Sequence, residues 1–222
     1  YTVGGGRQIG KTTSLKLFLE KLLRENTPPS ALLFLTGELI DDQHSLVREI
    51  QEFLEKAPRP AVVIVDEVTY IRDWDKGVKF LADAGQLAAV RLILTGSDLL
   101  LIQEARMRFP GRRGTASSVD FHIRPLSFKE FVELWGPPAS PALLEQYMVH
   151  GGFLTAINDF KRDCKVSNST LRTYSDWVRG DLLKKGRSET HLRSVAQALL
   201  RNQGTQVSWN SLARELPIDH PK

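Results

Sequence analysis

The sequence predicts an α/β fold in which a parallel sheet lies between two layers of helices, followed by a smaller helical region. Three features of the 222-residue chain lead to this prediction. Short, nearly continuous apolar runs alternate with helical patterns, a glycine-rich loop precedes the first helix, and the pattern becomes mainly helical from Ser127 onward. Strands buried on both faces are typical of parallel sheets, and this alternation implies right-handed crossovers with ligands at the carboxyl ends of the strands.

The elements of the first half follow from apolar spacing. Leucine and phenylalanine recur at helical spacing after the glycine loop, which predicts a helix from about Lys11 to Asn26, before Pro28 and Pro29. Further helices are predicted at Ser45–Glu55 and Trp74–Ala84. The predicted strands are Ala31–Leu35, Ala61–Val65, Val90–Leu94 and Val119–Ile123.

The second half is predicted to be helical, with a linker rich in glycine and proline at residues 136–141. At its end, Gln206–Leu216 has the pattern of a short strand, a Ser208 cap and a helix, which could open a winged helix. Helices are predicted at Phe128–Leu134, Ala142–His150, around Leu171–Leu183, and at His191–Arg201. The predicted domains are an α/β core at residues 1–136, a helical lid at 137–204 and the start of a possible winged helix at 205–222.

Composition sets broad limits on the class of protein. An apolar content of 41% over 222 residues suffices for one α/β core with a smaller appendage. The single cysteine, Cys164, cannot form an internal disulfide, and no Cys/His spacing suits zinc. We find neither an apolar run of the roughly 20 residues that span a bilayer nor a signal peptide, so we expect a cytoplasmic protein without a membrane partner. Because Tyr1 stands directly before the glycine loop, we expect the chain to be part of a longer protein.

Charge is distributed unevenly along the chain. Residues 1–100 hold 12 Lys+Arg against 14 Asp+Glu, whereas residues 101–222 hold 18 against 12. A basic C-terminal half permits contact with DNA. A solvated basic face is the alternative explanation.

The glycine-rich loop, from Gly5 to Thr12, matches the phosphate-binding pattern G-x-x-x-x-G-K-[ST] at every fixed position. Backbone N–H groups of such a loop surround a phosphate, and glycine permits the close approach. Lys11 is expected to reach the β- and γ-phosphates and the Thr12 hydroxyl to bind Mg²⁺. A chance glycine-rich turn is the alternative, but the amphipathic helix that follows favours phosphate binding. The residues predicted to contact the nucleotide are Gly5, Gly6, Arg7, Gln8, Ile9, Gly10, Lys11, Thr12 and Thr13.

A second motif ends the apolar run Val62–Val65 with Asp66 and Glu67. Asp66 is predicted to bind Mg²⁺, and Glu67 to polarise the attacking water as general base. A strand that simply ends in a polar turn is the alternative. Because the adjacent glutamate suits water as the nucleophile, hydrolysis is favoured over transfer to a small-molecule hydroxyl.

Two further segments carry candidate catalytic residues. If the strand Leu92–Leu94 lies between the strands of the two motifs, Thr95 or Ser97 could orient the water and sense hydrolysis; a capped turn is the alternative. Arg112 and Arg113 stand on a glycine-flanked loop, and one of them could stabilise charge on the transferring phosphoryl group, in trans from a neighbouring subunit. A solvated basic loop or a nucleic-acid contact is the alternative there.

Together with the segment Pro125–Phe131, these motifs resemble those of a large group of prokaryotic predicted ATPases of the AAA-plus superfamily. In that group a small helical region and a winged helix-turn-helix follow the same motifs. Pro-Leu-Ser-Phe-x-Glu is the most specific part of the resemblance, and Tyr147–Ala156 is similar to the group's Tyr…Gly-Gly-x-Pro-x-Ala stretch. The chain departs from the group at Gly6 and Leu154, where proline is frequent, and at Thr69, where glutamine is frequent.

The resemblance implies an ATP-binding, ATP-hydrolysing P-loop core with strand order 5-1-4-3-2. It also implies Asp66 on magnesium, Glu67 as base and Arg112 as the arginine finger, and it alone favours ATP over GTP. The leading hypothesis is an ATPase whose nucleotide state moves the helical region against a partner. The second is a nucleic-acid-binding regulator that uses ATP as a slow switch, with Trp209 either a core residue or a base-stacking platform. A scaffold with an inactive nucleotide site is the third.

Overall fold

The computed structural model describes residues 1–97, 109, 118–135, 138–184, 186 and 188–216. The chain divides into two compact units, Tyr1–Ile157 and Asn158–Lys222. The predicted division into separate domains, with a boundary near residue 136, remains a prediction. Among the described residues, none of the helices combines the length and the apolar composition that crossing a bilayer requires.

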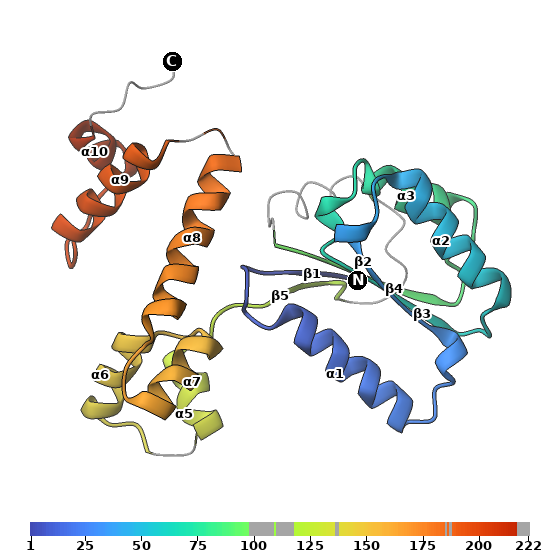
Figure 1. The fold of residues 1–222 in the computed structure, drawn as a ribbon, viewed down its shortest axis with the longest axis horizontal. Coiled ribbons are helices and arrows are strands. Elements are labelled where there is room, and N and C mark those ends of the chain that lie inside the picture. The colour runs from blue at the N-terminus through green and yellow to red at the C-terminus, as the bar shows by residue number, and fades with distance from the viewer. Residues whose placement is uncertain (98–108, 110–117, 136–137, 185, 187, 217–222) are drawn as a thin grey trace. The chain divides into compact units, whose positions relative to one another are not determined.

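The first unit contains a five-stranded parallel sheet with the order β2-β3-β4-β1-β5 (Figure 1). This confirms the predicted α/β class, and it is the order 5-1-4-3-2 read from the opposite edge. The strands are β1 (Thr2–Gly4), β2 (Leu32–Thr36), β3 (Ala61–Asp66), β4 (Val90–Gly96) and β5 (Asp120–His122). In this register Thr36 pairs with Asp66 and Gly4 pairs with Gly96. The carboxyl ends of β1, β2, β3 and β4 therefore lie together along one edge of the sheet, which is called its carboxyl edge.

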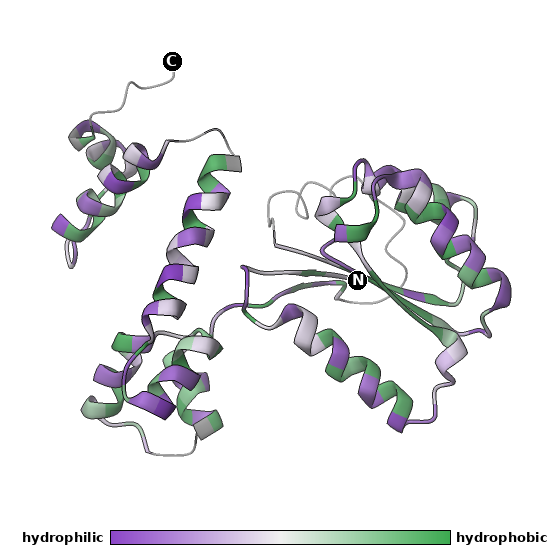
Figure 2. Ribbon diagram, in the orientation of Figure 1, coloured by the Kyte–Doolittle hydropathy of each residue, from purple (hydrophilic) through white to green (hydrophobic). Residues whose placement is uncertain are grey.

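Helices cover both faces of the sheet. Helix α1 (Lys11–Arg24) packs on the face that carries Val62 and Ile64. Helices α2 (Gln43–Lys56) and α3 (Trp74–Asp83) pack on the opposite face, which carries Val63 and Val65. All six residues of β3 are buried, because consecutive strand residues face opposite helical layers. Figure 2 shows the resulting hydrophobic strands between helices of mixed character.

Local chemistry explains where the observed boundaries differ from the predicted ones. Helix α2 begins at Gln43, earlier than predicted, because the Asp42 carboxylate accepts hydrogen bonds from the His44 and Ser45 N–H groups. Helix α1 ends at Arg24, and Asn26 adopts a left-handed conformation with φ 65°. Strand β2 starts one residue later than predicted, since Pro29–Ala31 forms the short 3₁₀ helix η1.

Six described helices follow the sheet. They are α5 (Phe128–Trp135), α6 (Pro141–His150), α7 (Leu154–Asp163), α8 (Asn168–Lys184), α9 (Glu189–Arg201) and α10 (Trp209–Glu215). Helix α7 was not predicted from the sequence. The Ser208 cap and the helix after it are confirmed, but the structure has no strand at residues 206–208, and the winged helix remains a prediction.

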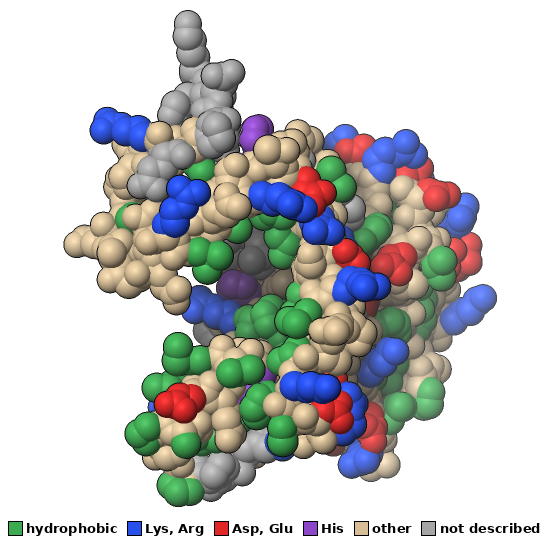
Figure 3. Space-filling model, turned by 60° about the vertical axis from the view of Figure 1, so that its left-hand side comes forward, with side chains coloured by type: hydrophobic (Ala, Val, Ile, Leu, Met, Phe, Trp, Pro, Cys, Tyr) green, Lys and Arg blue, Asp and Glu red, His purple; other side chains and the backbone are tan. Residues whose placement is uncertain are grey.

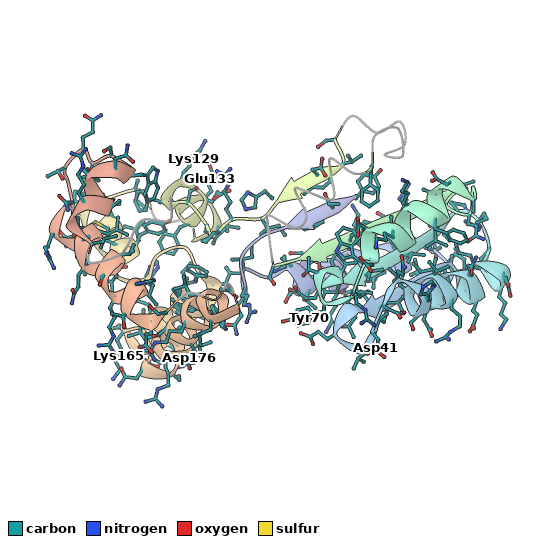
Figure 4. All side chains as sticks on the ribbon, turned by 90° about the horizontal axis from the view of Figure 1, so that it is seen from above. Asp41, Tyr70, Lys129, Glu133, Lys165 and Asp176 are labelled. Carbon is teal, nitrogen blue, oxygen red and sulfur yellow. The ribbon has the colours of Figure 1, made fainter. Side chains whose placement is uncertain are left out.

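The segment Pro125–Phe131 contains the capped N-terminus of α5. Ser127 and Glu130 form a reciprocal cap, in which the Ser127 N–H donates to Glu130 Oε2 at 2.7 Å and the Glu130 N–H donates to Ser127 Oγ at 3.3 Å. The Tyr147 hydroxyl donates to the Leu126 carbonyl at 2.6 Å. A Cβ at Gly152 would come within 2.0 Å of that carbonyl oxygen, so only glycine fits. On the solvent side of α5, Lys129 pairs with Glu133 at 3.8 Å (Figure 4).

Candidate nucleotide-binding site

The glycine-rich loop joins β1 to α1, and two of its positions require glycine, one because of a close contact and one because of its backbone conformation. A Cβ at Gly5 would lie 2.6 Å from the Ile123 carbonyl oxygen, and Gly10 has φ +94°. Gln8 also adopts a left-handed conformation, with φ 51°. The loop therefore curls tightly at the carboxyl end of β1 and feeds directly into the helix.

The start of α1 suits an anion. Its first turn contains no acidic residue, and the turn's free N–H groups carry the positive end of the helix dipole. All the residues predicted to contact the nucleotide, from Gly5 to Thr13, lie in this loop and first turn. The structure thus places them together where a phosphate group could be surrounded by backbone donors.

Lys11 is buried, with 5% of its surface exposed, at the start of α1. Its ammonium group donates to the carbonyl oxygens of Gly5 at 3.0 Å and Gly6 at 2.9 Å, and lies 3.4 Å from Glu67 Oε1. Since a buried ammonium needs such partners, the phosphate oxygens of a nucleotide could replace them.

Asp66 is the buried last residue of β3. Its carboxylate accepts a hydrogen bond from Thr12 Oγ1 at 2.6 Å and another from Thr95 Oγ1 at 2.5 Å. Hydroxyl and carboxylate oxygens are the hard ligands that Mg²⁺ prefers. The juxtaposed Thr12 and Asp66 side chains therefore fit the predicted metal-binding pair.

Glu67 follows Asp66 with a left-handed backbone, φ 53°. Its N–H donates to Thr95 Oγ1 at 2.9 Å. Its carboxylate oxygen Oε2 accepts from both the backbone N–H and the hydroxyl of Ser97, each at 3.1 Å. The carboxylate thus lies between Lys11 on one side and the end of β4 on the other.

Thr95 and Ser97, predicted as sensors, both contact the acidic pair. Thr95 is completely buried, and its hydroxyl bridges the Asp66 carboxylate and the Glu67 N–H. Ser97 contacts only the carboxylate of Glu67 among the hydrogen bonds described. The other predicted catalytic residue, Arg112, and its neighbour Arg113 lie outside the described residues.

Gly37 was not among the predicted site residues, although it follows β2 and approaches the Glu67 backbone closely. A glycine directly after a predicted strand was the available signal, because such a glycine often marks a close backbone approach. Leu154, at the start of α7, is a further neighbour of the loop that was not predicted. Its Cδ1 atom lies 3.7 Å from the position that a Gly10 Cβ would take.

Comparison with protein families matches residues 1–132 to the family model described as AAA domain. An uncharacterized protein of Haemophilus influenzae is 25% identical to the chain over 227 residues. The match covers 96% of the chain but 54% of the Haemophilus protein, so the chain spans about half the length of this curated relative.

Two solved structures share the fold at low sequence identity. The ORC2 protein of Aeropyrum pernix, solved in ADPNP–ADP complexes, is 14% identical with a TM-score of 0.58, over 96% of this chain and 72% of that one. A Walker-type ATPase of Pyrococcus abyssi is 14% identical with a TM-score of 0.54, over 96% of this chain and 83% of that one.

Proposed function

Because the chain belongs to the AAA domain family, we propose that it is a magnesium-dependent ATPase whose nucleotide state drives conformational change on a protein or DNA partner. The observation that carries this proposal is the convergence of Lys11, Thr12, Asp66 and Glu67 at one edge of the sheet. Lys11 lies 3.4 Å from Glu67, and Thr12 lies 2.6 Å from Asp66, although the two motifs are far apart in sequence.

Each of these residues has a distinct role in the proposed reaction. The loop N–H groups and Lys11 bind the phosphates, while Thr12 and Asp66 hold magnesium, which supplies electrostatic stabilisation of the phosphates when bound. Glu67 orients the attacking water and accepts its proton. Thr95 and Ser97 hold the two carboxylates in place through the hydrogen bonds described above.

The contact between the loop and α7 supports the conformational part of the proposal. Leu154, the first residue of α7, is a neighbour of Gly10 in the loop. A movement of the loop on nucleotide binding would therefore reach the start of α7 directly. The partner that such a movement acts on is either a protein or DNA.

Turnover of Mg²⁺-ATP by the wild type, Lys11→Ala and Glu67→Gln tests the assignment. Lys11→Ala should lose ATP binding, whereas Glu67→Gln should bind ATP and retain only a small residual turnover. Lys16→Ala on the exposed side of α1 and Glu49→Gln on the exposed side of α2 are matched controls that should behave as wild type. Wild-type protein that binds ATP without turnover at any concentration would contradict hydrolysis and leave the slow switch.

An arginine finger in trans requires an oligomer, which we test by mixing variants. Arg112→Ala and Glu67→Gln should each be inactive alone. If one subunit supplies its arginine to the site of another, a mixture of the two should regain turnover, because some interfaces then combine an intact Glu67 with an intact Arg112. Repeating the experiment with Arg113→Ala in place of Arg112→Ala identifies the arginine finger, because only the variant that lacks it should be inactive alone and regain turnover when mixed with Glu67→Gln.

Two observations favour a second function, that of a nucleic-acid-binding regulator with ATP as a slow switch. Residues 158–222 hold 12 Lys+Arg against 7 Asp+Glu. Trp209 is 82% exposed, as a base-stacking side chain would be. Figure 3 shows one face of the molecule, on which basic, acidic and hydrophobic side chains are all exposed.

Salt dependence separates this second function from the first. Binding to a fluorescent duplex or single strand should weaken steeply as salt rises if phosphate contacts carry it. Trp209→Ala should weaken single-strand binding, and Trp209→Phe should retain most of it. ATP turnover that is unaffected by DNA would favour the ATPase acting on a protein partner.

A further inference from the structure

Gly37 lies against the backbone of the proposed general base. It follows β2 in the short 3₁₀ helix η2 (Gly37–Leu39), and the preceding Thr36 pairs with Asp66 in the sheet register. A Cβ at Gly37 would lie 2.4 Å from the Glu67 carbonyl oxygen and 3.0 Å from the Glu67 carbonyl carbon. These are backbone atoms, which cannot turn aside as the end of a flexible side chain can.

The Glu67 backbone is in a conformation that its surroundings must hold. Its φ of 53° is in the left-handed region, which costs a residue with a side chain about 1 kcal/mol or more. On the β4 side, the Glu67 N–H is held by the Thr95 hydroxyl at 2.9 Å. On the other side, its carbonyl accepts the Tyr70 N–H at 3.1 Å, which closes the short helix η3 (Val68–Tyr70).

Gly37 completes this enclosure from the β2 side. Helices η2 and η3 lie next to each other, beyond the carboxyl ends of β2 and β3, and Figure 4 labels Tyr70 at the end of η3 and Asp41 just after η2. A methyl group at residue 37 would require the Glu67 carbonyl to move by about 1 Å to reach an ordinary contact distance. The Glu67 carboxylate would move with it.

We propose that Gly37 is a positioning residue, whose missing side chain lets the Glu67 backbone take the conformation that aims the carboxylate at the reacting water. The inference rests on the proposed function, because it assigns Gly37 to the step that Glu67 performs. None of the described contacts of the phosphate loop or of Lys11 involves Gly37. Nucleotide binding and catalysis should therefore separate in a Gly37 variant.

Gly77 in α3 offers a matched control. A Cβ there would lie 3.2 Å from the Gln43 carbonyl oxygen and 3.3 Å from Val47, so it too is tightly packed, but against α2 and away from the site. Gly77→Ala should therefore report the general cost of adding a methyl group to a packed glycine of this unit, with turnover per folded molecule unchanged.

The test measures kcat, KM, ATP affinity and melting for the wild type, Gly37→Ala and Gly77→Ala. Gly37→Ala should lower kcat by about 10- to 100-fold, the scale of a 1 Å misplacement, with ATP affinity retained. In a Glu67→Gln background, Gly37→Ala should cause no further loss of the residual turnover, because its effect passes through Glu67.

Three outcomes would overturn the inference while the proposed function stands. They are a Gly37→Ala enzyme with wild-type kcat, equal loss of kcat with or without Glu67, and loss of ATP binding or of cooperative melting in Gly37→Ala. The last would mean that the glycine serves the fold as a whole. If the wild type itself lacks turnover, the proposed hydrolysis fails and the role of Gly37 fails with it.

Discussion

Two buried aspartates in different parts of the chain accept hydrogen bonds from the same kind of partners but have different roles. Asp66 accepts from Thr12 and Thr95, which are 54 and 29 positions away in sequence. Asp159 accepts from Ser167 and Thr170, which are 8 and 11 positions away. A carboxylate held by hydroxyl groups is therefore not by itself a sign of chemistry.

The difference lies in what each network connects. Around Asp159 it closes the turn between α7 and α8, with Arg162 at 3.1 Å on the exposed side, so it orders a local junction. Around Asp66 it joins the ends of β3 and β4 to the phosphate loop, next to a helix start that favours anions. Long-range convergence at the carboxyl edge of the sheet, more than the residue types, distinguishes the proposed nucleotide site.

The largest expected effect comes from making the same substitution at both aspartates. Asp66→Asn should reduce Mg²⁺-dependent ATP turnover about 100-fold or more, because the metal contributes several kcal/mol of transition-state stabilisation. Asp159→Asn should leave turnover unchanged and lower the melting temperature. Turnover assays and melting curves on both variants check this pair. Equal losses of turnover would show that the two networks do not differ as described.

The acid response of the α7–α8 junction gives a second way to sharpen the comparison. Hydrogen bonds from the Ser167 hydroxyl, then from Thr170 and the Ser167 N–H, hold the pKa of Asp159 well below its ordinary value of 3.8. Because the folded-state pKa is lowered, this stabilisation is fully present above the ordinary pKa and is lost as the pH falls below it. Thr170→Val removes one donor and should move the loss of the junction to higher pH.

Hydrogen exchange at the Ser167 amide, corrected for its intrinsic rate between about pH 5 and pH 3, measures this effect. Thr173→Val is the matched control in α8, since that hydroxyl donates to the Ser169 carbonyl at 2.8 Å and does not touch Asp159. An identical pH profile for Thr170→Val and the control would contradict the assigned cause.

The same contrast explains what could be predicted from the sequence. The sheet order and the proximity of the Lys11 and Asp66 segments could be anticipated because local motifs and buried apolar runs specify the core, while the roles of these residues remain predictions. Helix α7 was missed because its apolar spacing is broken by polar residues, although Ala156 and Ile157 are buried in the folded chain. Gly37 was missed because its role depends on which backbone it approaches: a glycine after a strand can indicate a close approach, but the local sequence does not identify the Glu67 carbonyl as the neighbour.

The smallest expected effect compares two glycines under one substitution. Gly180 lies inside α8, and a Cβ there would meet nothing within 4 Å. Gly180→Ala should therefore stabilise the helix by roughly 0.5–1 kcal/mol, because alanine has less freedom to lose in a helix. Urea unfolding followed through nearby Trp177 measures this change, with ATP turnover expected to remain at the wild-type rate. Gly37→Ala adds the same methyl group where 2.4 Å separates it from the Glu67 carbonyl, and there we expect lost turnover instead. Destabilisation by Gly180→Ala would contradict the open space that surrounds a Cβ at residue 180, so the sign of the change tests this comparison.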